Sequence, residues 1–162
     1  MQHYRAGNEV ILAGEPHRPR VAILVRIRGL MVLVGSGAIL ALSAWFKPVG
    51  SGVGTHEQLD LPPCSFLERT GYPCPTCGLT TSVSAMAHGK FFLALKSHPF
   101  GVVIFVAIMI LAAAGAIELL TGRKAMSKLG KPAWWALGSI LGLFLGWVVK
   151  LIWGTLNGTL PL

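Results

Sequence analysis

Charged residues are scarce in this chain, and their scarcity argues against an ordinary soluble domain. Only 12% of the 162 residues are charged, whereas soluble domains usually carry about 25%. Hydrophobic residues make up 53%, and they are arranged neither as helix faces nor as alternating strand positions. They form three long runs, which is the pattern of a chain embedded in a bilayer.

Familiar catalytic motifs are also missing from the sequence. It contains no phosphate-binding glycine loop, no G-x-S-x-G and no H-E-x-x-H. The net charge of +8 does not predict nucleic-acid binding, because Lys and Arg flank the apolar runs and do not line one soluble face. The sequence therefore favours a protein that is not an enzyme and has no nucleic-acid partner.

The three apolar runs predict transmembrane helices at residues 27–46, 99–120 and 133–153. A helix of about 20 residues spans roughly 30 Å, the thickness of the hydrocarbon core. Lys150, in the last turn of the third run, is expected to extend its ammonium group outward to the interface. Small residues four positions apart favour close helix packing, and the third run has such a stripe at Gly138, Gly142 and Gly146.

Positive residues orient the three spans. Most lie in two regions that share one side of the membrane, namely Arg5, Arg18, Arg20, Arg26 and Arg28 before or at the start of the first span, and Arg123, Lys124, Lys128 and Lys131 between the second and third. The positive-inside rule then places a basic tail (1–26) and a basic loop (121–132) in the cytoplasm. The long loop 47–97 and the tail 154–162 are predicted to lie outside.

The only acidic residue near a span is Glu118, at the cytoplasmic end of the second run. An acid inside a membrane can mark a proton path. Because Arg123 and Lys124 follow closely, we expect an interfacial ion pair instead.

All three cysteines fall in the predicted outer loop, as Cys64, Cys74 and Cys77. Pro75 suits the first turn of a helix, so Cys74 is predicted to be its N-cap and Cys77 its N3 residue. Residues 75–88 then form a short amphipathic interfacial helix, and a second apolar stretch follows it. The predicted fold is therefore an all-α membrane protein with three transmembrane helices and one or two short interfacial helices in the outer loop.

Two interpretations of the cysteines involve sulfur chemistry alone. A disulfide from Cys64 to Cys74 or Cys77 would pin the loop in an oxidising compartment and contribute roughly 3 kcal/mol. Alternatively, Cys74 and Cys77 form a redox-active C-x-x-C pair at a helix N-terminus, where the helix dipole favours a thiolate. The sequence around this pair shows no thioredoxin-like βαβ pattern.

A third interpretation is a zinc site, in which the three cysteines would need a fourth ligand. His88 lies eleven residues after Cys77, which is about 16 Å along a continuous helix and too far for one ion. His56, Glu57 and Asp60, in the glycine-rich part of the loop, are better placed as the fourth ligand.

The cysteine loop also carries a recognisable motif. The run C-x-F-L-x-x-T-G-x-P-C-P-x-C-G-L-T, from Cys64 to Thr80, is followed by an apolar helix and a His-Gly pair. It resembles the bacterial domain-of-unknown-function family 2752 over about residues 60–120. The resemblance implies a small multi-span membrane protein with no established activity. Three positions depart from the family pattern. Thr81 stands where the family often has arginine, Lys90 where it often has an acidic residue, and His98 where it often has asparagine.

These features predict an accessory or scaffold protein of the bacterial cytoplasmic membrane with a cysteine-pinned outer loop and no bound cofactor. Its expected partners are the lipid bilayer and either another protein or further copies of the chain, because three helices alone enclose too little space for a transport path. The alternative is a thiol-redox or zinc-binding membrane protein that uses the three cysteines.

Overall fold

The computed structural model describes residues 19–129 and 132–158, and every regular element in these residues is helical. Three predicted features lie wholly or partly outside the described residues: the tail at 1–26, the tail at 154–162, and Lys131.

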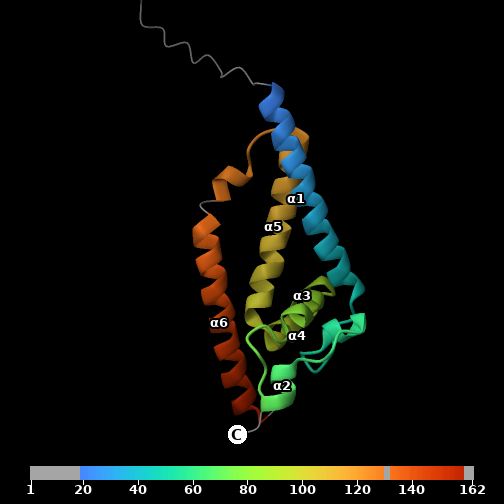
Figure 1. Cartoon of the computed structure of the whole chain (residues 1–162), viewed down its shortest axis with the longest axis vertical. Helices are drawn as coiled ribbons and strands as arrows, with labels where there is room; N and C mark the ends of the chain where they lie inside the picture. Colours follow the sequence, from blue (N-terminus) through green and yellow to red (C-terminus); the bar gives the residue numbers. More distant parts are fainter. Residues whose placement is uncertain (1–18, 130–131, 159–162) are drawn as a thin grey trace, which may run out of the picture.

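Three long helices dominate the structure: α1 (Pro19–Trp45), α5 (Pro99–Thr121) and α6 (Pro132–Leu156) (Figure 1). Each is long and apolar enough to cross a membrane. The predicted all-α fold with three membrane-spanning helices is therefore confirmed. Helix α1 begins eight residues before the predicted span, because the helix continues through the basic residues that flank the apolar run. Basic residues mark the end of the apolar run, but they do not end the helix.

Helices α1 and α5 pack against each other most extensively. Their backbones meet at Gly29 and Gly115, where a Cβ added to Gly29 would lie 2.7 Å from the Gly115 carbonyl oxygen. Only glycine permits such an approach between two helices, so these two residues fix how closely α1 and α5 pack. Neither was singled out by the spacing of small residues in the sequence.

A partly buried ion pair joins the same two helices. Glu118 of α5 is fully buried, and it accepts hydrogen bonds from Arg28 Nε at 3.0 Å and from a second guanidinium nitrogen of Arg28 at 2.5 Å. The backbone N–H of Met126 also donates to Glu118 Oε1, at 2.8 Å. The predicted ion pair exists, but its partner is Arg28 and not Arg123 or Lys124.

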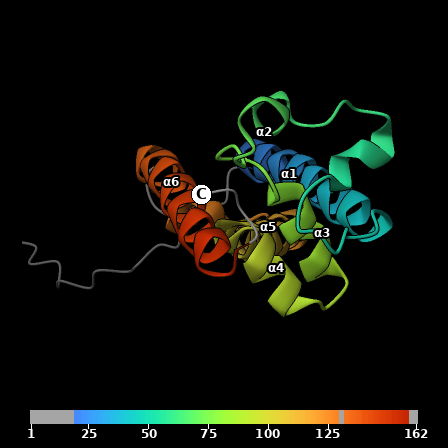
Figure 2. The same ribbon diagram turned by 90° about the horizontal axis from the view of Figure 1, so that it is seen from below.

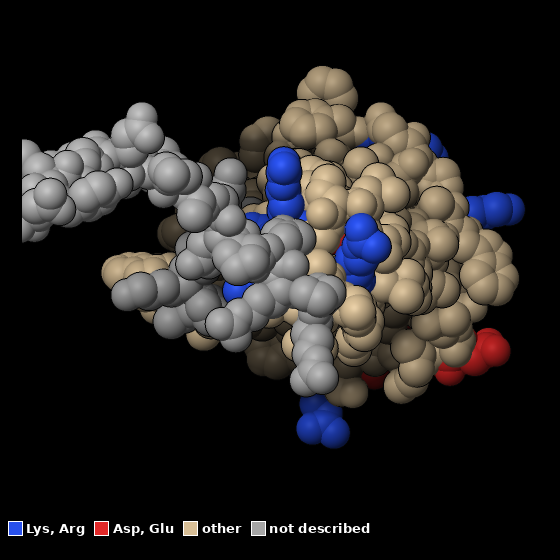
Figure 3. Space-filling view, turned by 90° about the horizontal axis from the view of Figure 1, so that it is seen from above, with Lys and Arg blue, Asp and Glu red and all other residues tan. Residues whose placement is uncertain are grey.

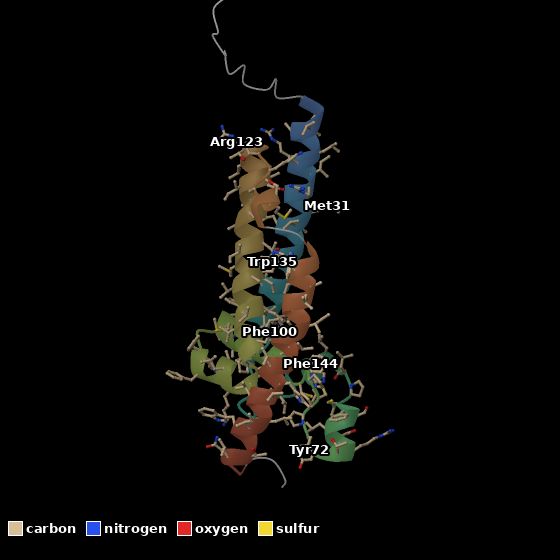
Figure 4. The ribbon with its side chains drawn as sticks, turned by 90° about the vertical axis from the view of Figure 1, so that its left-hand side faces the viewer. Met31, Tyr72, Phe100, Arg123, Trp135 and Phe144 are labelled. Atoms are coloured by element: carbon tan, nitrogen blue, oxygen red, sulfur yellow. The ribbon has the colours of Figure 1, made fainter. Side chains whose placement is uncertain are left out.

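Helix α6 stands apart from α5 over part of its length (Figure 1). The two helices leave a crevice of about 330 Å³ lined by apolar residues that include Phe100 and Trp135 (Figure 4). Gly138 faces open space, whereas a Cβ on Gly142 would lie 2.3 Å from the Phe100 ring and one on Gly146 would lie 2.7 Å from the His98 ring. Two of the three glycines in the predicted stripe thus lie against α5 and its N-cap residue.

The segment between α1 and α5 folds into short helices at one end of the molecule: η1 (Thr55–Leu59), α2 (Ser65–Thr70), α3 (Leu79–Ala87) and α4 (Phe91–Ser97) (Figure 2). Helix α3 packs on α4, α5 and α1. At the opposite end, Figure 3 shows several basic side chains on the face of the molecule, and Figure 4 labels Arg123 there.

Helix α3 differs from the predicted interfacial helix in its start and its surroundings. It begins at Leu79 and not at residue 75, because Gly78 is its N-cap and adopts a left-handed conformation with φ 84°. Its buried residues include three with hydroxyl groups, Thr81, Ser82 and Ser84. The hydroxyl of Ser82 donates to the His98 carbonyl at 2.9 Å, and that of Ser84 donates to the Phe46 carbonyl at 2.5 Å. These bonds tie α3 to the ends of α4 and α1.

Candidate metal and thiol site

The three cysteine thiols converge at one point. Cys64 is the N-cap of α2, and Cys74 and Cys77 lie on the turn that precedes α3. Their three Sγ atoms all lie within 4.8 Å of one another. The thiol of Cys64 makes no capping hydrogen bond, so it is not occupied in holding the helix end.

The turn before α3 brings Cys74 and Cys77 together. The backbone N–H of Cys77 donates to the Cys74 carbonyl at 3.0 Å, and the two Sγ atoms are also 3.0 Å apart. The predicted N-cap and N3 positions are therefore wrong, since Cys77 lies before the helix. Gly78 is needed here for space as well as for conformation, because an added Cβ would lie 2.5 Å from the Ser97 carbonyl oxygen.

All three cysteines are free thiols in the described structure. The disulfide predicted from Cys64 to Cys74 or Cys77 is not present there, and the Cys74–Cys77 separation of 3.0 Å exceeds the roughly 2.05 Å of an S–S bond. Something other than a disulfide must therefore hold this loop in place.

Side chains from α6 and from the residue that precedes α5 hold the cysteine turn by its backbone carbonyls. Trp147 Nε1 donates to the Pro73 carbonyl at 2.7 Å, and Lys150 Nζ donates to the Cys77 carbonyl at 3.0 Å. His98 Nε2 lies 3.0 Å from the carbonyl oxygen of Pro75, to which it donates. The carbonyls of Pro73, Pro75 and Cys77 thus each accept a hydrogen bond from a side chain that is distant in sequence. The thiols take no part in these bonds.

His98 is the most buried member of this set, at 0% exposed. Burial lowers its pKa, and the Pro75 carbonyl only partly offsets this effect. The ring is therefore neutral, and because Nε2 carries the proton, Nδ1 is an acceptor. Nδ1 has no hydrogen-bond partner among the described residues.

The thiols open into a cavity of about 360 Å³ between η1, α2 and α3. His56 and Glu57 of η1 line the same cavity as the three cysteines. Asp60, which the sequence also suggested as a ligand, ends η1 and is not among the lining residues. His88 lies elsewhere, with its Nδ1 2.9 Å from the Ser84 carbonyl oxygen. The three cysteines therefore form the candidate ligand cluster, and His56 and Glu57 are further possible donors that line its cavity.

The two closest thiols differ in acidity. Burial raises the pKa of Cys74, but its hydrogen bonds with Cys77 and Thr76 outweigh burial and lower that pKa to about 7. Burial and the shared hydrogen bond with Cys74 raise the pKa of Cys77 to about 12. Near neutral pH the pair thus carries at most one negative charge, and Cys74 is the more acidic of the two thiols. Such a group can act as a nucleophile or as a ligand for a soft metal ion.

Three supporting residues were not identified from the sequence. Lys150 was expected to extend outward, but its amine turns inward to the Cys77 carbonyl. Trp147 gave no signal beyond its place in an apolar run. His98 stood out only as a departure from the family pattern.

Comparison with protein families singles out the same region. The family described as a protein of unknown function (DUF2752) matches residues 64–112, which begin at the first cysteine and end within α5. No curated protein and no solved structure matches the chain. The resemblance predicted from the cysteine motif is therefore confirmed over residues 64–112, the segment that is similar to the DUF2752 family.

Proposed function

We propose that this chain is an integral membrane protein that binds one thiophilic metal ion, zinc in the first place, through Cys64, Cys74 and Cys77. One observation carries the proposal: three free thiols from two separate segments lie within 4.8 Å of one another. Thiolates bound to one zinc at about 2.3 Å in tetrahedral geometry lie about 3.8 Å apart. Small rotations of the side chains would bring the three sulfurs to that spacing.

His56 is the proposed fourth ligand. It lines the same cavity as the thiols, and three cysteines with one histidine form a common structural zinc set. Glu57, beside it, is the alternative donor. Three thiolates and one Zn²⁺ carry a net charge of −1, and the Lys150 ammonium, bound to the Cys77 carbonyl, lies where it would offset that charge.

The way the loop is held supports a chemical role for the thiols over a purely structural one. The scaffold interpretation relied on a disulfide to pin the loop, whereas Trp147, His98 and Lys150 bind the backbone of the turn directly. The cysteines are thereby left available to bind a ligand.

The proposed topology places the N-terminus in the cytoplasm and the cysteine loop on the outer face of a bacterial cytoplasmic membrane. Arg26, Arg28, Arg123 and Lys124 belong to the end of the helices opposite the cysteine loop, and Figure 4 shows Arg123 and Tyr72 at the two ends. Under the positive-inside rule the basic end faces the cytoplasm. Intact cells treated with reductant and chelator should then react with a membrane-impermeant maleimide; labelling only after lysis would reverse the topology.

The metal proposal is tested on the purified full chain. After incubation with Zn²⁺ and removal of the excess, elemental analysis should give one zinc per chain, and Co²⁺ should give intense thiolate-to-cobalt absorption. Single substitutions Cys64→Ser, Cys74→Ser and Cys77→Ser should each abolish tight binding. His56→Ala should weaken binding, with His88→Ala as the matched control that leaves it unchanged. Wild-type chain without bound zinc, or equal binding by all variants, would refute the proposal.

A second candidate function rests on the 3.0 Å separation of the Cys74 and Cys77 sulfurs. Here the Cys74 thiolate attacks a disulfide of a partner protein and forms a mixed disulfide, releasing one partner thiolate. Cys77 then loses its proton and attacks Cys74, so that this chain gains the disulfide and the partner is left as a dithiol. The buried Cys77 would be the resolving residue.

Trapping distinguishes this candidate from metal binding. A Cys77→Ala variant should accumulate a mixed disulfide through Cys74, whereas a Cys64→Ala control should turn over without accumulation. Metal binding instead requires all three cysteines. A chain that binds zinc and forms no mixed disulfide in Cys77→Ala supports the first proposal alone.

A further inference from the structure

A second cavity lies on the α6 side of the cysteine loop. It has a volume of about 370 Å³, and its lining includes Lys96 of α4, Lys150 and Trp153 of α6, and Ser51 and Pro73 of the loop. None of the cysteines lines it. The thiols and the lysines therefore belong to two neighbouring but separate cavities.

The charged residues that line this second cavity are all basic. No Asp or Glu is among the described residues that line it, and the salt bridge recorded in the described part of the chain joins Arg28 and Glu118 at the opposite end. Lys150 is partly buried, and its recorded hydrogen bond goes to the neutral carbonyl of Cys77. An ammonium group has three donors and is costly to bury without an anion. Lys150 also faces the cysteine turn, but Lys96 has no acidic residue beside it in the lining, so the cavity favours a negatively charged occupant.

The position of the cavity favours a lipid phosphate as that occupant. Trp153 belongs to the last turns of α6, which ends at Leu156, and tryptophan is enriched at the level of the lipid headgroups. On α4, Lys96 follows the exposed apolar side chains of Phe92 (88% exposed) and Leu95 (37% exposed). A basic residue beside exposed apolar groups is the arrangement of a helix that lies at the membrane surface.

We propose that the cavity between α4, α6 and the cysteine loop binds the phosphate group of an anionic phospholipid, through the ammonium groups of Lys96 and Lys150. Trp153 lies beside the headgroup, and the apolar side of α4 lies against the acyl chains. The ligand chemistry is a phosphate anion, which free inorganic phosphate also offers. This proposal does not depend on metal binding at the thiols.

The test compares lipids bound to the purified full chain by native mass spectrometry. Phosphatidylglycerol should bind in preference to phosphatidylcholine. A lysine near a membrane surface contributes about 1 kcal/mol, so Lys96→Gln should weaken phosphatidylglycerol binding about fivefold. Lys90→Gln, an exposed lysine near α4 that does not line the cavity, is the matched control and should bind as the wild type does. Lys150→Gln should weaken binding at least as much as Lys96→Gln.

Further arms identify the source of the phosphate and keep the test independent of folding. Competition by millimolar inorganic phosphate would assign the site to a free anion and would overturn the lipid proposal. Lys96→Gln should keep the zinc content of the wild type, because Lys96 does not contact the thiols; this separates loss of the lipid site from loss of the metal site. Equal binding of phosphatidylglycerol by Lys96→Gln and Lys90→Gln, or no preference for the anionic lipid, would overturn the proposal.

Discussion

The two ends of the helical bundle bury polar groups in different ways. At the basic end, the Glu118 carboxylate is fully enclosed and its oxygens accept from Arg28 and from the backbone of Met126. At the cysteine end, side-chain donors bind backbone carbonyls of the turn, while the three thiols form no disulfide and His98 Nδ1 has no hydrogen-bond partner among the described residues. A fully paired group stabilises the fold, whereas a group held in place but left unpaired is available to a ligand. We infer that the first end is structural and the second is functional.

The largest expected effect comes from breaking the pair at the structural end. Arg28→Met leaves the buried Glu118 carboxylate without its cation and should lower the free energy of unfolding by about 3 kcal/mol, the low end for buried pairs because Arg28 is 46% exposed. Reversible unfolding in detergent measures the loss. Arg26→Met, two residues away on α1, is the control and should cost far less, and zinc content should be unchanged in both. An equal loss in the two variants would remove the contrast between the ends.

Metal removal should act on the other end alone. At zinc concentrations about one hundred times the dissociation constant, binding stabilises the folded chain by about 2.7 kcal/mol, and chelation should remove that amount. Amide hydrogen exchange should then accelerate at residues 64–79 while the α1–α5 contact at Gly29 stays protected. Uniform acceleration across the chain would mean that the two ends are not separable.

Close helix packing should matter at the α1–α5 contact and not where α6 is open. Gly29→Ala places a Cβ 2.7 Å from the Gly115 carbonyl oxygen and should cost about 2 kcal/mol by overpacking. Gly138→Ala meets nothing within 4 Å and should be neutral or slightly stabilising, since alanine favours helix. Thermal unfolding of the two variants checks this, and a larger loss for Gly138→Ala would show that α6 packs on something outside this chain.

The smallest effect is expected from one donor to the cysteine turn. Trp147→Phe removes the hydrogen bond to the Pro73 carbonyl and should cost about 1 kcal/mol of stability. Because this bond orients the ligand turn, zinc affinity should fall by about tenfold or more. Trp135→Phe, in the crevice between α5 and α6, should leave zinc affinity unchanged. A Trp147→Phe variant with wild-type affinity would show that the turn needs no support from α6.

The three spans could be predicted because an apolar run of sufficient length is a local property of the sequence. A zinc site that joins the three cysteines is only one of the interpretations that the sequence allows. Cys64 is ten residues from Cys74, and the distance between their thiols depends on how the chain folds. The start of α3 was missed for a physical reason. Pro75 is compatible with a first helical turn, but Gly78 adopts a left-handed conformation that ends the turn before the helix begins.

The residues that support the site were not predictable from local pattern. Trp147 and Lys150 are more than seventy residues from the carbonyls they bind, so their role depends on how α6 packs against the loop. A lysine near the end of an apolar run normally extends to the interface. Here its amine turns toward the Cys77 carbonyl because the loop folds back over α6. Partners set by tertiary packing leave no periodic signal in one sequence.

The most direct test of the account is X-ray absorption at the zinc edge of the full chain, purified and loaded with one equivalent of Zn²⁺. The account predicts three sulfur ligands at about 2.3 Å and one nitrogen ligand at about 2.0–2.1 Å, with the nitrogen lost in His56→Ala and retained in His88→Ala. A shell of nitrogen and oxygen ligands alone, or a wild-type chain that retains no zinc, would contradict it.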